Sequence, residues 1–260
     1  MNYYENIMEF IRLSMVKCFG VCPTRIFLSI CLKVWSNCVN MLFIFLLLLV
    51  EDMILCYDHR PRFHISAPRK QWINDPNGPF WDSKSELYHI FMQNNPQNCT
   101  WGNISWAHRV SRDLIHWKVV DEALVPGPGS YDQNGVFSGS IFRQQSDLQD
   151  QLAVSSIYYT CVDSKDRQMQ CRAESNDPLM LVWNKAVNNP VIATPPPGGD
   201  PLNFRDPTVW QEGPESQFKM IVAASIYQEG VVAMYHYGHE QDNKTRSWEY
   251  QGVVWNAFVS

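Results

Sequence analysis

The chain has no cluster of basic residues and no recognisable set of metal ligands. Its 260 residues hold 21 Lys and Arg against 26 Asp and Glu, a formal net charge of -5. Because nucleic acids are bound by clustered positive charge, this balance argues against a nucleic-acid partner and favours a small neutral substrate. Cys18 and Cys22 lack the second pair that a zinc site would need, and we expect neither a metal nor an organic cofactor. Metal-ligand spacing is equally lacking among the histidines, which are His59, His64, His89, His108, His116, His236 and His239.

The chain also lacks an apolar run of bilayer length. The longest uninterrupted stretch is Met41–Val50, which as a helix at about 1.5 Å per residue would span roughly half of a bilayer core. This is the length of a signal-peptide core, and Lys33 and Asn37 interrupt its extension toward the N-terminus. A small-x-small cleavage site is missing, so three alternatives stay open: a cleaved signal peptide, an uncleaved membrane anchor, or a leading segment without function. We expect residues 1–54 to hold this apolar helix and residues 55–260 to be translocated.

The part of the chain after the apolar run has features of an exported protein. Glycosylation sequons begin at Asn98, Asn103 and Asn243, which favours a secreted glycoprotein. Cysteines also occur on both sides of the run. The four before it are Cys18, Cys22, Cys31 and Cys38, and the four after it are Cys56, Cys99, Cys161 and Cys171. In an oxidising compartment the second group either forms disulfides or serves as small apolar residues.

A repeat of about 65 residues organises the chain after residue 55. Tryptophans recur at this interval as Trp117, Trp183 and Trp248, and each unit opens on an apolar strand that ends at Trp81, Phe142 or Trp210. Between these marks lie segments rich in β-branched and aromatic residues, so we predict four strands per unit, with the unit ending on its tryptophan. Such units are typical of a β-propeller, in which the first strand of each blade lines a central channel. Three units should form an open arc with an unpaired edge, because closure takes about four to eight blades.

Two acidic motifs stand at the openings of the first and third units. WINDPNGPFW spans Trp72–Trp81 and FRDPTVW spans Phe204–Trp210. Each places an aspartate, Asp75 or Asp206, directly before a proline and at the head of an apolar run, where a carboxylate can face a shared pocket. Two carboxylates that converge on a sugar are the minimum equipment of a glycosidase. The aromatic load of 13 Phe, 11 Tyr and 10 Trp suits both sheet packing and stacking on sugar rings.

Five motifs in order resemble the β-fructofuranosidases of glycoside hydrolase family 32, with acid invertases and fructan exohydrolases as the nearest group. NDPNG alone is a good turn sequence and would carry little weight. The resemblance runs from about His64 to Tyr250. The motifs are WINDPNGP, FMQNNP, WGNISWAHRVSRDLIHW, YDQNGVFSGS and FRDP.

The resemblance implies a five-bladed propeller followed by a β-sandwich, and a retaining double displacement on a fructosyl unit. Asp75 matches the nucleophile and Asp206 the stabiliser of the transition state. We expect Asn74 and the turn amides to keep Asp75 ionised, and the charge of Arg205 to keep Asp206 deprotonated. Further positions match residues that line the fructosyl pocket, although packing between blades is the simpler role for the phenylalanine. They are Trp72 at the rim, Gln93, Trp101, Phe137 and Ser138.

The sequence departs from the family pattern in its proton donor. The acid/base glutamate of a Trp-Glu-Cys motif should open the next unit, which lies beyond Ser260, and the C-terminal sandwich is absent as well. Glu249 resembles this glutamate but follows a unit-ending tryptophan, so we place it on an outer strand. General acid catalysis contributes on the order of 10²–10⁴-fold in rate. Two smaller departures are Cys161, where glycine is usual, and Ile73, where methionine is usual.

Two functions follow from this reading. The first is a fragment of a hydrolase that cleaves terminal β-D-fructofuranosides such as sucrose or a fructan, in the secretory pathway and then the cell wall or vacuole. The second is an inactive sugar-binding or regulatory remnant of an invertase. The resemblance does not rank sucrose against fructan, and it leaves open a membrane anchor in the N-terminal segment.

Overall fold

The computed structural model describes residues 64–143, 155–212, 217–238 and 247–256. The predicted apolar helix within residues 1–54, the sequon at Asn243 and Cys56 lie outside these ranges. The chain divides into two compact units, residues 1–62 and residues 63–260, and only the second contains described residues. Among the residues in these ranges, no helix is long and apolar enough to cross a membrane.

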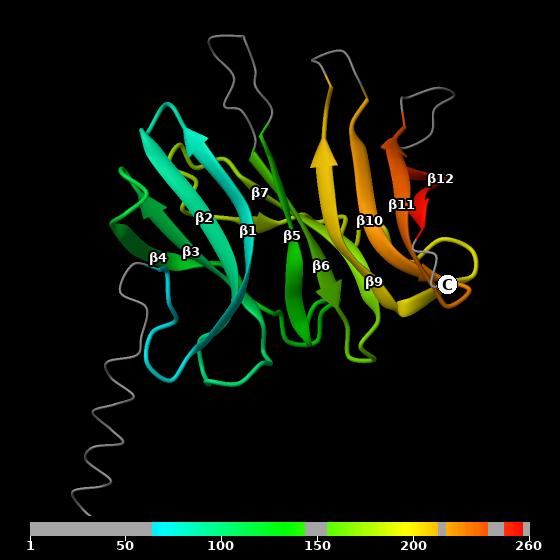
Figure 1. The fold of residues 1–260 in the computed structure, drawn as a ribbon, viewed down its shortest axis with the longest axis horizontal. Helices are drawn as coiled ribbons and strands as arrows, with labels where there is room; N and C mark the ends of the chain where they lie inside the picture. The colour runs from blue at the N-terminus through cyan, green and yellow to red at the C-terminus, as the bar shows by residue number, and fades with distance from the viewer. Residues whose placement is uncertain (1–63, 144–154, 213–216, 239–246, 257–260) are drawn as a thin grey trace, which may run out of the picture. The chain divides into compact units, whose positions relative to one another are not determined.

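The described residues form twelve β-strands in three antiparallel sheets of four (Figure 1). Each sheet is a meander in which consecutive strands pair, so every sheet is made from one continuous segment of the chain. The first sheet contains β1 (Trp72–Asp82), β2 (Leu87–Asn95), β3 (Ser105–Ser111) and β4 (Trp117–Leu124). The second contains β5 (Gly135–Arg143), β6 (Ser155–Val162), β7 (Gln168–Ser175) and β8 (Asn184–Lys185). The third contains β9 (Gly199–Trp210), β10 (Lys219–Ile226), β11 (Glu229–Tyr237) and β12 (Trp248–Asn256).

The four-stranded units of the predicted repeat are confirmed, with one correction to their boundary. Trp117 and Trp248 are the first residues of β4 and β12, and Trp183 directly precedes β8. The unit therefore does not end on its tryptophan, as predicted, but continues through a fourth strand that begins there. Glu249 lies on β12, the last strand of its sheet, which confirms its predicted place on an outer strand.

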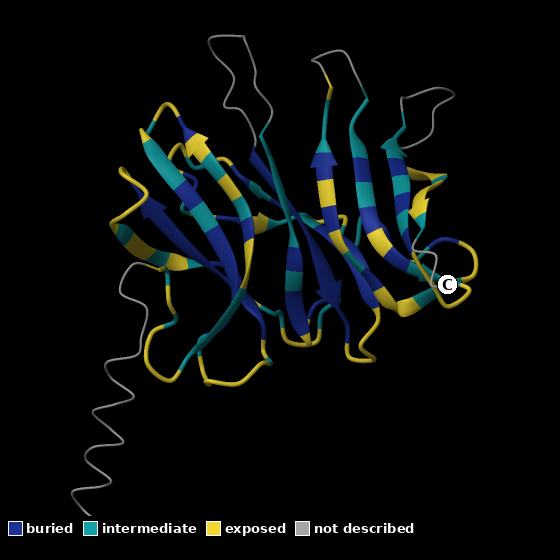
Figure 2. Cartoon of the chain, viewed as in Figure 1, coloured by how far each residue is buried: buried dark blue, intermediate teal, exposed yellow. Residues whose placement is uncertain are grey.

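The sheets pack against one another through alternate residues of the same strand. β6 is buried along its whole length (Figure 2). Its residue Tyr159 packs in an apolar cluster with Trp106 of the first sheet, whereas Tyr158 packs in a second cluster with Phe204 of the third sheet. Because successive side chains of a strand point to opposite faces, the middle sheet is covered on both sides. The first strand of the middle sheet, β5, contacts the first strands of both other sheets, β1 and β9.

A disulfide joins two strands of the middle sheet. Cys161 of β6 bonds to Cys171 of β7, and both residues are fully buried in the cluster between the first two sheets. The cysteine at position 161, which was unexplained from the sequence, therefore has a partner that only the fold reveals. Among the described cysteines, Cys99 is unbonded and exposed.

Two buried histidines face each other inside the first sheet. His89 Nδ1 lies 3.0 Å from His108 Nε2, and both rings are almost completely inaccessible to solvent. The ring of Phe80 stacks on His89 and the ring of Phe91 stacks on His108, with centroids 4.6 and 4.1 Å apart. Apolar rings on either side favour two uncharged imidazoles.

Burial of this pair predicts a loss of stability in acid. Burial lowers the pKa of His89 to about 4, with Asp82 raising it and Arg143 lowering it further, and lowers the pKa of His108 to about 3, aided by His89 and Arg109. In the unfolded chain the two histidines have a pKa of about 6.5, so below that pH the unfolded chain binds protons that the folded chain cannot. The free energy of unfolding should therefore be fully retained above about pH 6.5 and fall as the pH decreases toward 4 and 3.

Urea unfolding followed between pH 7 and pH 4.5 measures this loss. His108→Gln removes one of the two titrating rings and should make the decrease smaller, whatever its effect on stability at pH 7. An equal decrease in wild type and variant would show that other groups cause the acid sensitivity.

Candidate functional site

Three site residues lie at irregularities of the three first strands. Asp75 is in a register shift of β1, Ser138 in one of β5 and Asp206 in one of β9. At such a bulge the strand carries an extra residue, which bends the backbone and re-aims side chains. Asp75 and Asp206 each precede a proline, which has no N–H to give to a sheet ladder and is tolerated at bulges. The bulges direct these three side chains out of the regular alternation of their strands.

A chain of hydrogen bonds connects four of the predicted site residues to Asp75. The Trp72 indole N–H donates to Asn74 Oδ1 at 2.9 Å, and Asn74 Nδ2 donates to Gln93 Oε1 at 2.6 Å. Gln93 Nε2 then donates to Ser138 Oγ at 2.7 Å, and Ser138 Oγ donates to Asp75 Oδ2 at 2.8 Å. The chain crosses from the first sheet to the second, and Gln93 is buried within it.

This geometry corrects the role expected for Asn74. We expected Asn74 and the turn amides to stabilise the Asp75 carboxylate, but the Asn74 side chain forms its hydrogen bonds with Trp72 and Gln93. The observed donor to Asp75 is the hydroxyl of Ser138, which comes from the neighbouring sheet. The sequence motif around Asp75 could not reveal a donor that is 63 residues away in the chain.

Asp75 is close enough to Asp206 to influence the charge of Asp206. Burial raises the pKa of Asp206, the neighbouring Asp75 carboxylate raises it further, and Arg205 opposes both. We expected Arg205 to keep Asp206 deprotonated. Its charge does act in that direction, but burial outweighs it, and its guanidinium donates to Gln168 Oε1 at 3.3 Å. The sequence thus indicated the direction of the Arg205 effect, but not the larger and opposite effect of burial on the pKa of Asp206.

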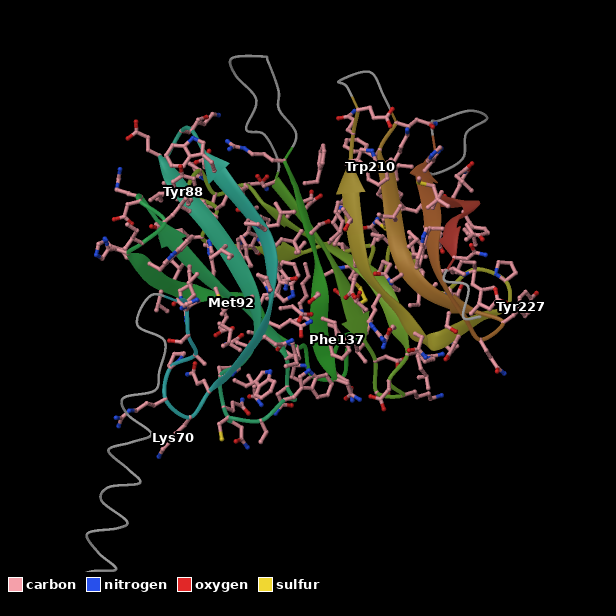
Figure 3. All side chains as sticks on the ribbon, in the orientation of Figure 1. Lys70, Tyr88, Met92, Phe137, Trp210 and Tyr227 are labelled. Atoms are coloured by element: carbon pink, nitrogen blue, oxygen red, sulfur yellow. A yellow bond between two sulfur atoms is a disulfide. The ribbon has the colours of Figure 1, made fainter. Side chains whose placement is uncertain are left out.

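Two aromatic residues of the predicted pocket contact each other beside these carboxylates. Phe137 precedes Ser138 on β5, and Figure 3 shows it on the middle sheet between the sheets of β1 and β9. The ring of Trp101, from the loop between β2 and β3, packs edge-on against Phe137 with centroids 5.6 Å apart. Trp101 is 57% exposed, so one face of its ring is open to solvent and to a ligand.

The described residues hold no group of three or more His, Cys, Asp or Glu side chains that could bind a metal ion. What the site offers is two carboxylates, a serine hydroxyl, an amide and an exposed aromatic ring. A residue that the sequence did not single out also belongs to it: Thr160 of β6 accepts a hydrogen bond from the Asp206 N–H at 3.0 Å. Asp206 itself has a φ of 65°, which is uncommon for a residue other than glycine.

The fold and the site place the chain in a class of all-β proteins built from repeated four-stranded antiparallel sheets, with an aspartate on the first strand of the first sheet close to an aspartate on the first strand of the third. Residues 64–257 match the family described as "Glycosyl hydrolases family 32 N-terminal domain". The chain belongs to glycosyl hydrolases family 32.

Comparison with individual proteins supports this family assignment. The chain is 40% identical over 180 residues to "Acid beta-fructofuranosidase 1, vacuolar" of a Rosa hybrid cultivar, covering 68% of this chain and 29% of that protein. It is 45% identical over 152 residues to "Beta-fructofuranosidase 1" of Zea mays, covering 57% of this chain and 21% of that protein. Among solved structures, fructan 1-exohydrolase IIa from Cichorium intybus superposes with a TM-score of 0.62 at 32% identity, covering 74% of this chain and 34% of that one. The chain thus spans about a third or less of the length of these relatives.

Proposed function

We propose that the chain provides the fructosyl-binding and nucleophilic part of a retaining β-fructofuranosidase. The observation that carries this proposal is the proximity of Asp75 and Asp206, from the first strands of the first and third sheets, with Ser138 of the middle sheet hydrogen-bonded to Asp75. A retaining glycosidase needs one carboxylate to attack the anomeric carbon and a site that stabilises an oxocarbenium-like transition state. Family membership supports the same reaction on sucrose or a fructan.

Each residue has a distinct part in the proposed reaction. An oxygen of the Asp75 carboxylate forms a bond to the anomeric carbon as the bond from that carbon to the leaving-group oxygen breaks, and the leaving group takes the electron pair. Asp206 accepts hydrogen bonds from sugar hydroxyls. Water later attacks the anomeric carbon of the fructosyl ester and gives up a proton to solvent, and the bond from that carbon to Asp75 breaks, which returns Asp75 to its carboxylate form. Ser138 and Gln93 orient Asp75, and the exposed ring of Trp101 supplies a stacking surface at the rim.

We further propose that the three sheets are blades of a five-bladed propeller, with β1, β5 and β9 as inner strands. The contacts of β5 with both β1 and β9 support this arrangement. Glu249 lies on the outer strand β12, so we do not assign it the role of proton donor to a sugar leaving group. A vacuole or cell-wall location is favoured by the vacuolar rose relative and by "Beta-fructofuranosidase, insoluble isoenzyme 3" of Oryza sativa subsp. indica, which is 37% identical over 179 residues. We propose glycans at Asn98 and Asn103, which are both exposed.

An aryl fructoside tests the proposal on the chain itself. p-Nitrophenolate is stable as an anion and leaves without a proton, so cleavage of p-nitrophenyl β-D-fructofuranoside does not depend on the acid/base glutamate. We expect a burst of p-nitrophenolate and a peptide containing Asp75 that carries one fructosyl group in the mass spectrum. Sucrose should release glucose far more slowly. Binding of fructose without any burst would instead support the sugar-binding remnant.

Ser138→Ala should slow the burst by about 10- to 100-fold. The substitution removes the hydroxyl that donates to Asp75 and accepts from Gln93, and a hydrogen bond to a charged group contributes about 1.5–3 kcal/mol. Stopped-flow absorbance of p-nitrophenolate measures the rate. Ser164→Ala, at an exposed serine outside the site, is the matched control. An unchanged burst in Ser138→Ala would remove Ser138 from the proposed site.

A further inference from the structure

Three buried polar side chains form hydrogen bonds with the backbone of β9 at Phe204 and Asp206. Gln168 Oε1 accepts a hydrogen bond from the Phe204 N–H at 2.9 Å, and Gln170 Nε2 donates to the Phe204 carbonyl at 2.8 Å. Thr160 Oγ1 accepts from the Asp206 N–H at 3.0 Å and donates to Gln170 Oε1 at 3.1 Å. We call Thr160, Gln168 and Gln170 the β9 clamp.

The clamp lies at one of the register irregularities of β9. Asp206 is at the bulge of the strand, and its φ of 65° is a left-handed conformation that non-glycine residues rarely adopt. Such a conformation persists only where the surrounding structure imposes it. The bond from the Asp206 N–H to Thr160 and the two bonds to Phe204 fix both sides of Arg205, and thereby the direction in which the Asp206 side chain leaves the strand.

The residues of the clamp are costly to bury, and the hydrogen bonds above give partners to both polar side-chain atoms of Gln170, to Oγ1 of Thr160 and to Oε1 of Gln168. Thr160 and Gln170 are inaccessible to solvent and Gln168 is nearly so. Apolar residues would fill the space between β6, β7 and β9 without the need for partners, whereas a satisfied polar network selects one arrangement of the groups that it joins. Here that arrangement is the conformation of residues 204–206.

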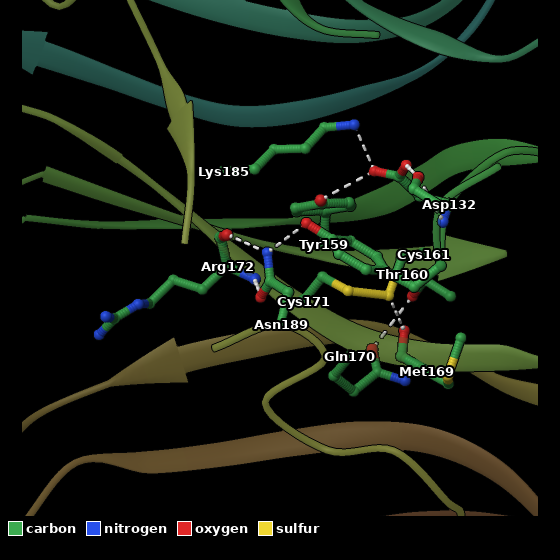
Figure 4. The surroundings of a disulfide bond; sticks show 12 residues. Asp132, Tyr159, Thr160, Cys161, Met169, Gln170, Cys171, Arg172, Lys185 and Asn189 are labelled. Atoms are coloured by element: carbon green, nitrogen blue, oxygen red, sulfur yellow. Dashed lines mark hydrogen bonds and ion pairs between the residues drawn. A yellow bond between two sulfur atoms is a disulfide. The ribbon is translucent and has the colours of Figure 1, made fainter. Parts of the chain in front are cut away.

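A disulfide ties together the two strands that bear the clamp. Thr160 and Gln170 are directly paired across β6 and β7, and Cys161 and Cys171 follow them in sequence, as Figure 4 shows. Successive side chains of a strand point to opposite faces, so the disulfide lies behind the clamp, in the core shared with the first sheet. It holds the strands in register at the level of Thr160 and Gln170.

We infer that Thr160, Gln168 and Gln170 are positioning residues that set the Asp206 carboxylate against Asp75, with the Cys161–Cys171 disulfide keeping them in register. The inference deepens the proposed function and rests on it, because the catalytic role of the two carboxylates is taken from that proposal. None of these side chains needs to touch the sugar. They act through the backbone that carries Asp206.

The exchange Thr160→Val tests the inference, because it keeps the shape of the side chain and removes its hydroxyl. In the full chain, carbon-13 NMR should follow the titration of the Asp206 carboxyl group, assigned with Asp206→Asn. We expect Thr160→Val to lower the pKa of Asp206 from its raised value toward the ordinary one, because a carboxyl group that leaves its place loses the partial burial and the proximity to Asp75 that raise its pKa. Affinity for fructose, measured by calorimetry, should fall at least about tenfold, as expected when a charged group is displaced from its ligand. Thr160→Ser should restore both, and Thr194→Val, at an exposed threonine, should change neither.

The two measurements separate the possible outcomes. A variant that melts at a lower temperature but keeps the wild-type titration of Asp206 and the wild-type affinity would overturn the inference and leave the clamp a purely structural role. If Thr160→Val does not fold, Gln168→Met removes the acceptor of the Phe204 N–H, and the same shifts are expected. If wild type binds no fructose, the proposed function fails, while the titration still decides whether the clamp positions Asp206.

Discussion

Replacing Asp75 with asparagine is expected to abolish the fructosyl ester and the burst of p-nitrophenolate. Asparagine has the size of aspartate and can still pair with Ser138, but its amide cannot attack an anomeric carbon as a carboxylate does. The loss of one member of a catalytic unit typically costs on the order of 10⁴-fold or more in rate. Rapid-quench mass spectrometry of the Asp75 peptide and absorbance of the released phenolate together measure the effect.

The matched control is Asp121→Asn, at an exposed aspartate on β4 away from the carboxylate pair. It should form the ester at the wild-type rate. Asp75→Asn should also retain fructose affinity within a few-fold, because Asp206 and the exposed Trp101 ring remain in place. A burst in Asp75→Asn equal to that of wild type would show that a different residue is the nucleophile, and the role of the NDPNG motif would have to be abandoned.

Asp132→Ala is expected to have the largest effect on stability. Asp132 is fully buried, and its Oδ2 lies 2.5 Å from Lys185 Nζ and accepts from the Tyr159 hydroxyl at 3.1 Å. Its Oδ1 accepts from Ser130 Oγ at 2.6 Å and from the Gly127 N–H at 3.0 Å. Removal of one partner of a buried ion pair costs about 3–5 kcal/mol, because the other charge and the donors lose their partner.

Urea unfolding at neutral pH measures this loss. Asp121→Ala is the control, since Asp121 is an exposed residue of β4, and it should cost less than about 1 kcal/mol. Lys185→Met separates the contribution of charge from that of the hydrogen bonds, since it leaves three donors on Asp132. A loss in Asp132→Ala no greater than in Asp121→Ala would mean that the loop before β5 does not depend on this carboxylate.

The sequence was sufficient to predict the large units of the fold. The interval between Trp117, Trp183 and Trp248 indicated three four-stranded sheets, because each sheet is formed by four strands that are consecutive in the sequence. It also predicted that Asp75 and Asp206 would approach each other. Local patterns of this kind are legible from residue order alone.

The details of the site were not predictable in the same way. The donor to Asp75 comes from another sheet, and the raised pKa of Asp206 depends first on its burial in the folded chain. The bulges that aim the carboxylates do not change the apolar pattern enough to be seen. The pairing of Cys161 with Cys171, and the bonds of Thr160 to β9, follow from how sheets dock, which an alternation of apolar residues does not encode.

The meander of each sheet has a consequence for how the protein folds. Contacts within a sheet join neighbouring segments, so each sheet can form soon after its strands leave the ribosome. The carboxylate pair, in contrast, draws one aspartate from the first sheet and the other from the third, and exists only after all three sheets have docked. Competence to bind sugar should therefore appear late in folding, after most of the secondary structure is in place.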